Sequence, residues 1–143
     1  MTIRVAVISD AAEIAQLTTQ LGYVADAETV ARRLVKLGRQ RDHVVLVAVL
    51  EEKVVGWLQA HASDTLESGY RVEIVGLIIS EFCRRRGIGS VLVQHAEKWA
   101  CDLGAEAVIV RSNIKRVESH AFYPALGYSS SKTQTVYRRH LKT

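Results

Sequence analysis

The residues best suited by type and spacing to do chemistry lie in one stretch, residues 77–90, which reads LIISEFCRRRGIGS. An apolar segment is followed by three arginines, then by two glycines one residue apart, then by a helical pattern. The first backbone N–H groups of a helix lack intrahelical partners and lie at the positive end of its dipole, so they bind phosphate oxygens. Gly87 and Gly89 would let a ligand approach the backbone closely. The stretch therefore predicts a site for a phosphate-bearing ligand.

The same stretch excludes two common classes of phosphate-binding protein. It has neither the GxxxxGK[ST] pattern of a P-loop nor the three-glycine pattern of a dinucleotide fold. A nucleotide triphosphatase and a dehydrogenase are therefore disfavoured. An isolated arginine triplet would also be compatible with a solvated helix entry, so the interpretation depends on the elements around it.

Glu73 is the candidate general base, because it is the one carboxylate in the otherwise apolar segment 72–79. A carboxylate buried in such surroundings accepts a proton more readily near neutral pH. The alternative is a structural glutamate that faces solvent or pairs with an arginine such as Arg71. His61 and His120 have the same ambiguity, since each could line a pocket or lie on the surface. Neither Cys83 nor Cys101 has a CxxC partner, so no metal site or disulfide framework is predicted.

Length and composition limit what can position these residues. The chain has 143 residues, 48% of them hydrophobic and 24% charged, which predicts one domain over residues 1–143 with a real core. The longest aliphatic run, residues 44–50, is far shorter than the roughly 20 residues of a membrane-spanning helix. The first residues lack the pattern of a secretion signal, so we expect a cytoplasmic protein without membrane association.

Hydrophobic periodicity predicts an alternation of strands and helices. We expect strands at residues 3–7, 43–50, 53–61, 72–79 and 107–110, with two more strand-like stretches within 128–141. Helices are expected between a cap at Ser9 or Asp10 and Gly22, and at residues 27–37, 87–103 and 117–126. A strand-helix-strand crossover over residues 72–110 needs a parallel pair. The order predicts an α/β fold with a mixed sheet and helices on both of its faces.

The stretch 77–90 resembles the acetyl-CoA-binding motif of the GNAT superfamily of N-acetyltransferases, in which an LxV strand precedes [RQ]xxGx[GA] and a long helix. Leu77, Ile79, Arg84, Gly87 and Gly89 stand at the matching positions, and Glu81 replaces a proline that is common after the strand. Residues 112–128 are similar to the closing motif of the same superfamily, an asparagine followed by FYxxxG[FY]. The residue pattern of this second motif looks most like that of the small-molecule branch of the superfamily, which acts on aminoglycosides and aminoalkylphosphonates.

The resemblance implies a central, mostly antiparallel sheet of about seven strands with a splayed parallel pair, flanked by about four helices. It implies acetyl-CoA as cosubstrate and no metal. The backbone amides of the turn would hold the pyrophosphate, and the main chain of the strand would pair with the pantetheine arm. The turn residues are Arg84, Arg85, Arg86, Gly87, Ile88, Gly89 and Ser90, and the strand residues are Leu77, Ile78 and Ile79.

The resemblance also assigns catalytic roles. Asn113 would bond the pantetheine amides and Tyr123 would be the general acid for the departing thiolate. Glu73 stands where the histone-acetylating branch keeps its catalytic glutamate, and the backbone N–H of Ile79 would stabilise the oxyanion. A strand opened at a bulge would admit the thioester, and Gly76 is the bulge candidate. The family transfers directly in a ternary complex, so a covalent route through a cysteine is disfavoured.

The sequence leaves the acetyl acceptor open. A small primary amine, such as an aminoglycoside or an aminoalkylphosphonate, is favoured over a protein or peptide amine. A non-catalytic acyl-CoA-binding regulatory module is the alternative of another class, and Tyr123 with Glu73 argues against it. Residues 107–143 carry seven basic residues against Glu118, yet no nucleic-acid-binding motif accompanies them, so nucleic acid is an unlikely partner. The apolar and aromatic content of residues 128–141 permits a homodimer.

Overall fold

A computed structural model describes residues 1–111 and 117–142. The chain divides into two compact units, Met1–Arg111 and Ser112–Thr143. The prediction of a single domain over residues 1–143 stays a prediction.

The first unit is built on one sheet. Among the described residues the sheet has five strands, in the order β1 (Thr2–Val5), β2 (His43–Leu50), β3 (Lys53–Thr65), β4 (Gly69–Ile79) and β5 (Ala107–Val110). Neighbouring strands are antiparallel except β4 and β5, which are parallel. The mixed, mostly antiparallel sheet with one parallel pair is therefore confirmed.

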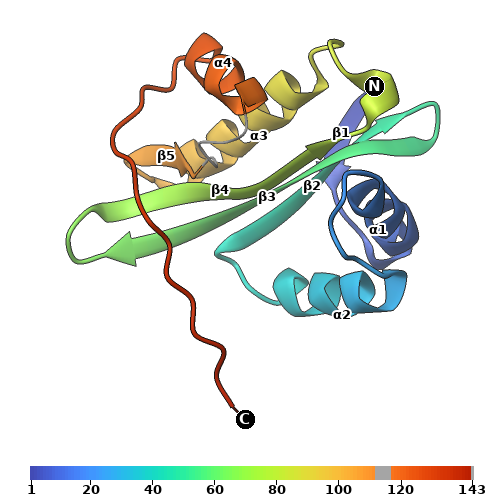
Figure 1. Ribbon diagram of the computed structural model, residues 1–143, viewed down its shortest axis with the longest axis horizontal. Helices are drawn as coiled ribbons and strands as arrows, with labels where there is room; N and C mark the ends of the chain where they lie inside the picture. The colour runs from blue at the N-terminus through green and yellow to red at the C-terminus, as the bar shows by residue number, and fades with distance from the viewer. Residues whose placement is uncertain (112–116, 143) are drawn as a thin grey trace. The chain divides into compact units, whose positions relative to one another are not determined.

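Helices cover both faces of this sheet. α1 (Ala11–Gln20) and α2 (Ala27–Gly38) lie on one face, and α3 (Ile88–Leu103) lies on the other (Figure 1). Alternate residues of a strand point to opposite faces, so each strand contributes to two apolar layers. Ile14 of α1 packs with Val47 and Val54 of the sheet on the first face. Leu92 of α3 is fully buried on the second.

Local sequence explains most of the element ends. α3 begins after Gly87 and ends before Gly104, both in the left-handed conformation that glycine adopts without strain. Glu51 and Glu52 form the two-residue turn between β2 and β3, with left-handed φ values of 50° and 66°. The connection between β3 and β4 is shorter than expected, because β3 continues past residue 61 to Thr65 and β4 begins at Gly69, before residue 72.

The first helix begins as predicted, but Asp10 does not cap it. A short 3-10 turn, η1 (Ile8–Asp10), precedes α1, and the buried Asp10 carboxylate accepts two hydrogen bonds from Arg4 at 2.8 and 2.9 Å. It also accepts a bond from the Val7 backbone N–H at 2.8 Å. The hydrogen bonds from the Arg4 guanidinium hold the pKa of Asp10 below its ordinary value. The carboxylate thus ties β1 to the start of α1.

The second unit contains the fourth helix, α4 (Val117–Ala125). Pro124 lies in its last turn, and Gly127 follows with a φ of 95°. The backbone N–H groups of Gly127 and Tyr128 donate to the carbonyls of Pro124 and Tyr123 at 3.0 and 3.1 Å, which closes the end of the helix. Four helices are therefore present among the described residues, as predicted.

The sheet differs from the prediction in its strand number, five in the described part of the chain instead of about seven. The two extra strands were expected within residues 128–141, which have no regular structure. Val136, Tyr137 and Leu141 in this segment are 83%, 91% and 75% exposed. A strand needs a neighbour to satisfy its backbone and to cover its apolar side chains, and alternation of residue types does not supply one.

Candidate active site

The site begins with an irregularity in β4. Gly76 lies opposite Gln59 of β3, whereas Ile74 lies opposite Ala60, so Val75 is an extra residue and forms a β-bulge. The ring of Trp57 covers Gly76, and a Cβ added there would meet ring atoms at 2.7 and 2.8 Å. Real Cβ atoms essentially never lie so close, so this position requires glycine unless the indole moves.

β4 loses one of its two neighbours at the same place. In the described residues, β5 pairs with β4 only from Arg71 to Ile74, so residues 76–79, after the bulge, are paired with β3 alone. The N–H of Ser80 donates to the Val55 carbonyl of β3 at 2.8 Å. Alternate N–H groups along a strand point to the same side, so those of Leu77 and Ile79 point away from β3. The strand thus presents two backbone positions to the side that β5 has left.

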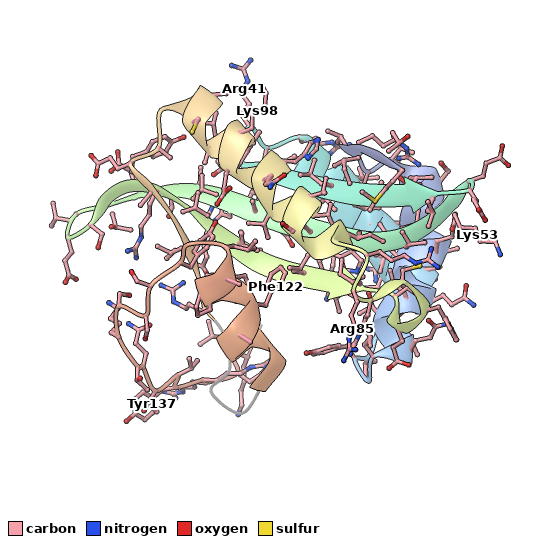
Figure 2. The ribbon with its side chains drawn as sticks, turned by 90° about the horizontal axis from the view of Figure 1, so that it is seen from above. Arg41, Lys53, Arg85, Lys98, Phe122 and Tyr137 are labelled. Carbon is pink, nitrogen blue, oxygen red and sulfur yellow. The ribbon has the colours of Figure 1, made fainter. Side chains whose placement is uncertain are left out.

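The open part of β4 leads into a basic turn at the start of α3. A short 3-10 turn, η2 (Glu81–Cys83), is followed by three exposed arginines and then by Gly87 at the N-cap of α3. Figure 2 shows one of them, Arg85, on the turn between β4 and α3. Its φ of 65° and that of Gly87, 75°, are both left-handed. The arginines are Arg84, Arg85 and Arg86.

The N-terminus of α3 is well suited to hold an anion. The first intrahelical bond is donated by the N–H of Val91 to the carbonyl of Gly87 at 3.1 Å, so the preceding N–H groups are not used inside the helix. Gly87 lacks a side chain that could cap them. α3 has 16 residues, and its dipole adds positive potential to that of the arginines. Ile88 and Gly89 are buried and Ser90 is half-buried.

Glu73 lies in the fully paired half of β4, opposite His61 of β3 and Ile109 of β5. Its side chain is 25% exposed and forms an ion pair with Arg111, the residue after β5. The carboxylate is thus not buried in apolar surroundings as expected. The alternative of pairing with an arginine is what the structure contains, with Arg111 in place of Arg71, because the parallel strand β5 ends beside Glu73.

Two histidines lie in line with Glu73 across the sheet. His43 of β2 lies opposite His61, and their rings stack with centroids 4.1 Å apart and an interplanar angle of 12°. The Asp42 carboxylate lies 3.9 Å from His43 Nε2 and 3.5 Å from His61 Nε2. Burial, reinforced by repulsion from His61, lowers the pKa of His43 below its ordinary value. Of these three residues the sequence pointed only to His61.

The remaining predicted residues belong to the second unit. Tyr123 is half-buried, and its ring makes edge contacts with Phe122 and Tyr128 at centroid distances of 4.9 and 5.9 Å. Asn113 lies outside the described residues, and so does the side chain of His120. The roles of Asn113 and Tyr123 therefore stay predictions. In the first unit, Cys83 is buried and Cys101 is exposed, and both are free thiols.

Several known proteins are similar to this chain in sequence. It is 28% identical over 113 residues to an uncharacterized N-acetyltransferase of Bacillus subtilis, covering 78% of this chain and 79% of that protein. It is 35% identical over 86 residues to the aminoalkylphosphonate N-acetyltransferase of Salmonella typhimurium, covering 59% of this chain and 56% of that protein. This second relative is matched over only about half of its length.

The fold is shared with solved structures at lower identity. The crystal structure of an aminoglycoside 6′-N-acetyltransferase from Acinetobacter haemolyticus superimposes with a TM-score of 0.84 at 16% identity, covering 99% of this chain and 100% of that one. Among the described residues, every helix is too short or too polar to cross a bilayer. The profile of the Acetyltransferase (GNAT) family matches residues 11–128, most of the chain. The protein therefore belongs to the GNAT acetyltransferase family, and its relatives are N-acetyltransferases.

Proposed function

We propose that the protein is an acetyl-CoA-dependent N-acetyltransferase that transfers the acetyl group directly to a primary amine in a ternary complex. The observation that carries this proposal is the half of β4 without a β5 partner, which leads into the basic turn and the N-terminus of α3. The family to which the chain belongs uses acetyl-CoA. One strand therefore offers backbone groups to an extended arm, and the next helix offers N–H groups to phosphates.

Each part of the cosubstrate has a matching feature in the first unit. The outward N–H of Leu77 suits an amide carbonyl of pantetheine, which can pair with β4 as a missing strand would, and the outward N–H of Ile79 suits the carbonyl oxygen of the thioester. The N–H groups of Ile88, Gly89 and Ser90 suit the pyrophosphate, with the exposed arginines adding long-range attraction. Binding of the cosubstrate in this way depends on backbone N–H groups and needs few particular side chains along β4.

The chemistry requires a neutral amine, a polarised carbonyl and a proton for the departing sulfur. In our proposal the amine nitrogen bonds to the carbonyl carbon of the thioester while the carbon–sulfur bond breaks. The Ile79 N–H stabilises the negative oxygen, and Tyr123 gives a proton to the thiolate. Glu73 lies six residues before Ile79 on β4, so it accepts the proton that the amine loses through a chain of ordered waters. Since Arg111 pairs with Glu73, the last water of this chain must compete with the guanidinium for the carboxylate.

We propose a small amine as the acceptor. The name of the Salmonella relative says that it acts on aminoalkylphosphonates, and that of the Acinetobacter neighbour says that it acts on aminoglycosides. Both are small molecules with a primary amine. A peptide or protein amine is the competing acceptor, and a panel containing both kinds distinguishes them.

The first experiment is isothermal titration of the whole chain with acetyl-CoA and with CoA. Wild type should bind both in the micromolar range, and Arg86→Glu should weaken both because it places a negative charge beside the pyrophosphate. Arg33→Glu is the matched control, since it reverses the charge of another exposed arginine, on α2 and away from the turn. Gly89→Asp should abolish binding, but Gly89 is buried, so the thermal unfolding of this variant must be checked first.

The second experiment follows thiol release with a panel of amines. Glu73→Gln and Tyr123→Phe should each lower kcat by about 10²-fold or more while leaving acetyl-CoA binding intact. Binding without turnover on any amine would identify a non-catalytic acyl-CoA-binding module instead. An absence of binding in wild type would overturn the proposal altogether.

A further inference from the structure

We propose that Asp42, His43 and His61 form a binding site for a divalent transition metal ion, with zinc as the reference ion. Asp42 directly precedes β2, His43 begins β2 and His61 lies in β3, and each contributes one ligand atom. The site does not depend on the proposed acetyl transfer and uses none of the residues to which that reaction assigns a role.

The geometry brings three suitable donor atoms together. All of them lie within 4.8 Å of one another, and the Nε2 atoms of both imidazoles lie close to the same carboxylate. Zinc binds histidine nitrogen and carboxylate oxygen at about 2.0–2.2 Å, which places two donors about 3.3 Å apart. The described cluster therefore needs only a small tilt of the stacked rings to close around an ion.

The separations suit a shared ligand better than direct hydrogen bonds. The two Nε2 to carboxylate distances, 3.9 and 3.5 Å, are longer than the usual 2.7–2.9 Å of a charge-assisted bond. Two imidazoles stacked at 4.1 Å would also repel one another if both were protonated. An ion between the three donor atoms would remove both disadvantages.

The backbone holds the ligands in place before any ion binds. His43 and His61 are direct register partners in the β2–β3 ladder. The Ala62 N–H donates to the Asp42 carbonyl at 2.7 Å, which fixes the residue before β2 against β3. Ligands on paired strands lose little conformational freedom on binding, so much of the cost of ordering the site has already been met.

Gln59 supplies an outer partner of the kind that metal-binding histidines use. Its side-chain amide lies 3.4 Å from His43 Nδ1. When Nε2 binds a metal, Nδ1 carries the proton and needs an acceptor, which the Gln59 amide provides through its oxygen after a half-turn. The amide can thus support the neutral ring in either orientation.

The donor set selects the kind of ion. Imidazole nitrogens suit zinc, copper and nickel, whereas magnesium and calcium prefer sites made of oxygen. Three protein ligands leave a fourth position for water or another ligand. The side chains of His43, His61 and Asp42 are 17%, 34% and 53% exposed, so an ion can reach them from solvent.

The test is calorimetric titration of the untagged full chain, first stripped with EDTA, with zinc chloride and separately with magnesium chloride. We expect one zinc per chain, a higher Tm in zinc, and no response to magnesium. His61→Ala should weaken zinc binding by more than the roughly 10–100-fold typical of outer-partner changes. His95→Ala is the matched control, because it removes an exposed imidazole on α3. Equal zinc affinity in wild type and His61→Ala would overturn the proposal.

A second measurement keeps the proposal falsifiable if His61→Ala does not fold. Cobalt(II) bound by wild type at a tetrahedral nitrogen and oxygen site should show visible d–d absorption, which zinc should displace. Imidazole NMR signals of His43 and His61 should shift in slow or intermediate exchange on zinc addition, while that of His95 should not. Shifts distributed over all histidines would mean unspecific binding and would also overturn the site.

Discussion

The two halves of β4 differ in how many neighbours they have. Residues 69–74 pair with β3, and those from Arg71 to Ile74 also pair with β5. After the bulge at Val75, residues 76–79 pair with β3 alone within the described chain. Within the described residues, the same strand therefore has one half whose backbone pairs on both sides and another whose backbone pairs with β3 on one side and with no strand on the other.

The difference determines which part of a residue can act. In the paired half the backbone is occupied, so chemistry depends on side chains, such as Glu73 with its partner Arg111. In the open half the N–H groups of Leu77 and Ile79 are the useful features, and the side chains pack above and below the sheet. Substitutions should therefore affect the first half through residue identity and the second through the backbone.

The largest effect is expected from removing one backbone N–H in the open half. Replacing the Ile79 amide by an ester should lower kcat by about 10²–10³-fold, the usual loss for one oxyanion donor. Stability should change little, because this N–H points away from β3. The measurements are steady-state kinetics with the best amine and unfolding in urea.

The matched control is the same replacement at Ile78, whose N–H points toward β3. There the ester should lower the free energy of unfolding by about 1 kcal/mol, the usual net value of a hydrogen bond. The kcat of the folded fraction should change less than at Ile79. If the two esters had equal effects on kcat and on stability, the two sides of the strand would not be distinct.

The next largest effect concerns the bulge that separates the halves. Gly76→Val should lower the free energy of unfolding by about 2–3 kcal/mol, because its side chain would overlap the Trp57 ring. That ring is held by a 3.0 Å hydrogen bond from its Nε1 to Thr18 and by packing in the core of the α1 face. Chemical denaturation measures the change.

Gly38→Ala is the control for the bulge, since an added Cβ there meets no atom within 4 Å. Its effect should be within about 0.5 kcal/mol of zero or slightly stabilising. A similarly small effect of Gly76→Val would mean that the indole yields easily and that the bulge does not require glycine.

The sequence predicts the features that depend on local patterns. The glycine ends of α3, the strand before the basic turn, the glycine beside the bulge, and the two-residue spacing between β2 and β3 each follow from residues within a few positions. Except for the spacing of β2 and β3, these are also the features that form the open half of β4 and the basic turn. Apolar and aromatic residues alone do not predict a strand when no neighbouring strand is specified. Residues 128–141 contain such residues, yet several of them are exposed and the segment forms no strand.

The histidine pair shows what local patterns miss. A regular hairpin with a two-residue turn at Glu51 and Glu52 would pair His43 with Ala60. The register of β2 and β3 shifts by one residue after Ala48, with Val55 as the extra residue, and this brings His61 opposite His43. A shift of one residue moves every later side chain to the other face. The partnership of Glu73 with Arg111 likewise depends on where β5 ends.

The next prediction compares two valine-to-alanine substitutions in β4. Val72 is fully buried in the paired half, so Val72→Ala should lower the free energy of unfolding by roughly 2 kcal/mol through lost burial and a cavity. Val75 at the bulge is 46% exposed, and Val75→Ala should cost less than about 0.5 kcal/mol. Thermal or urea unfolding of the two variants measures the contrast, and equal costs would contradict it.

The smallest effect is a pH dependence of the free energy of unfolding. It arises from His43, which lies in line with His61 and Glu73 across β2, β3 and the paired half of β4. Burial and the neighbouring His61 lower the pKa of His43 from its ordinary 6.5, so below that pH the unfolded chain binds more protons than the folded one. The free energy of unfolding should therefore fall as the pH drops through 6.5 toward the lower folded pKa, and below both values the loss is complete. Urea unfolding of wild type and His43→Gln between pH 5 and 8, with EDTA present, measures this, and the difference between the two should change with pH in that window. If the difference in unfolding free energy between wild type and His43→Gln did not change with pH, His43 would be as easily protonated in the sheet as in water. His43 and His61 would then be solvated despite their place in the sheet.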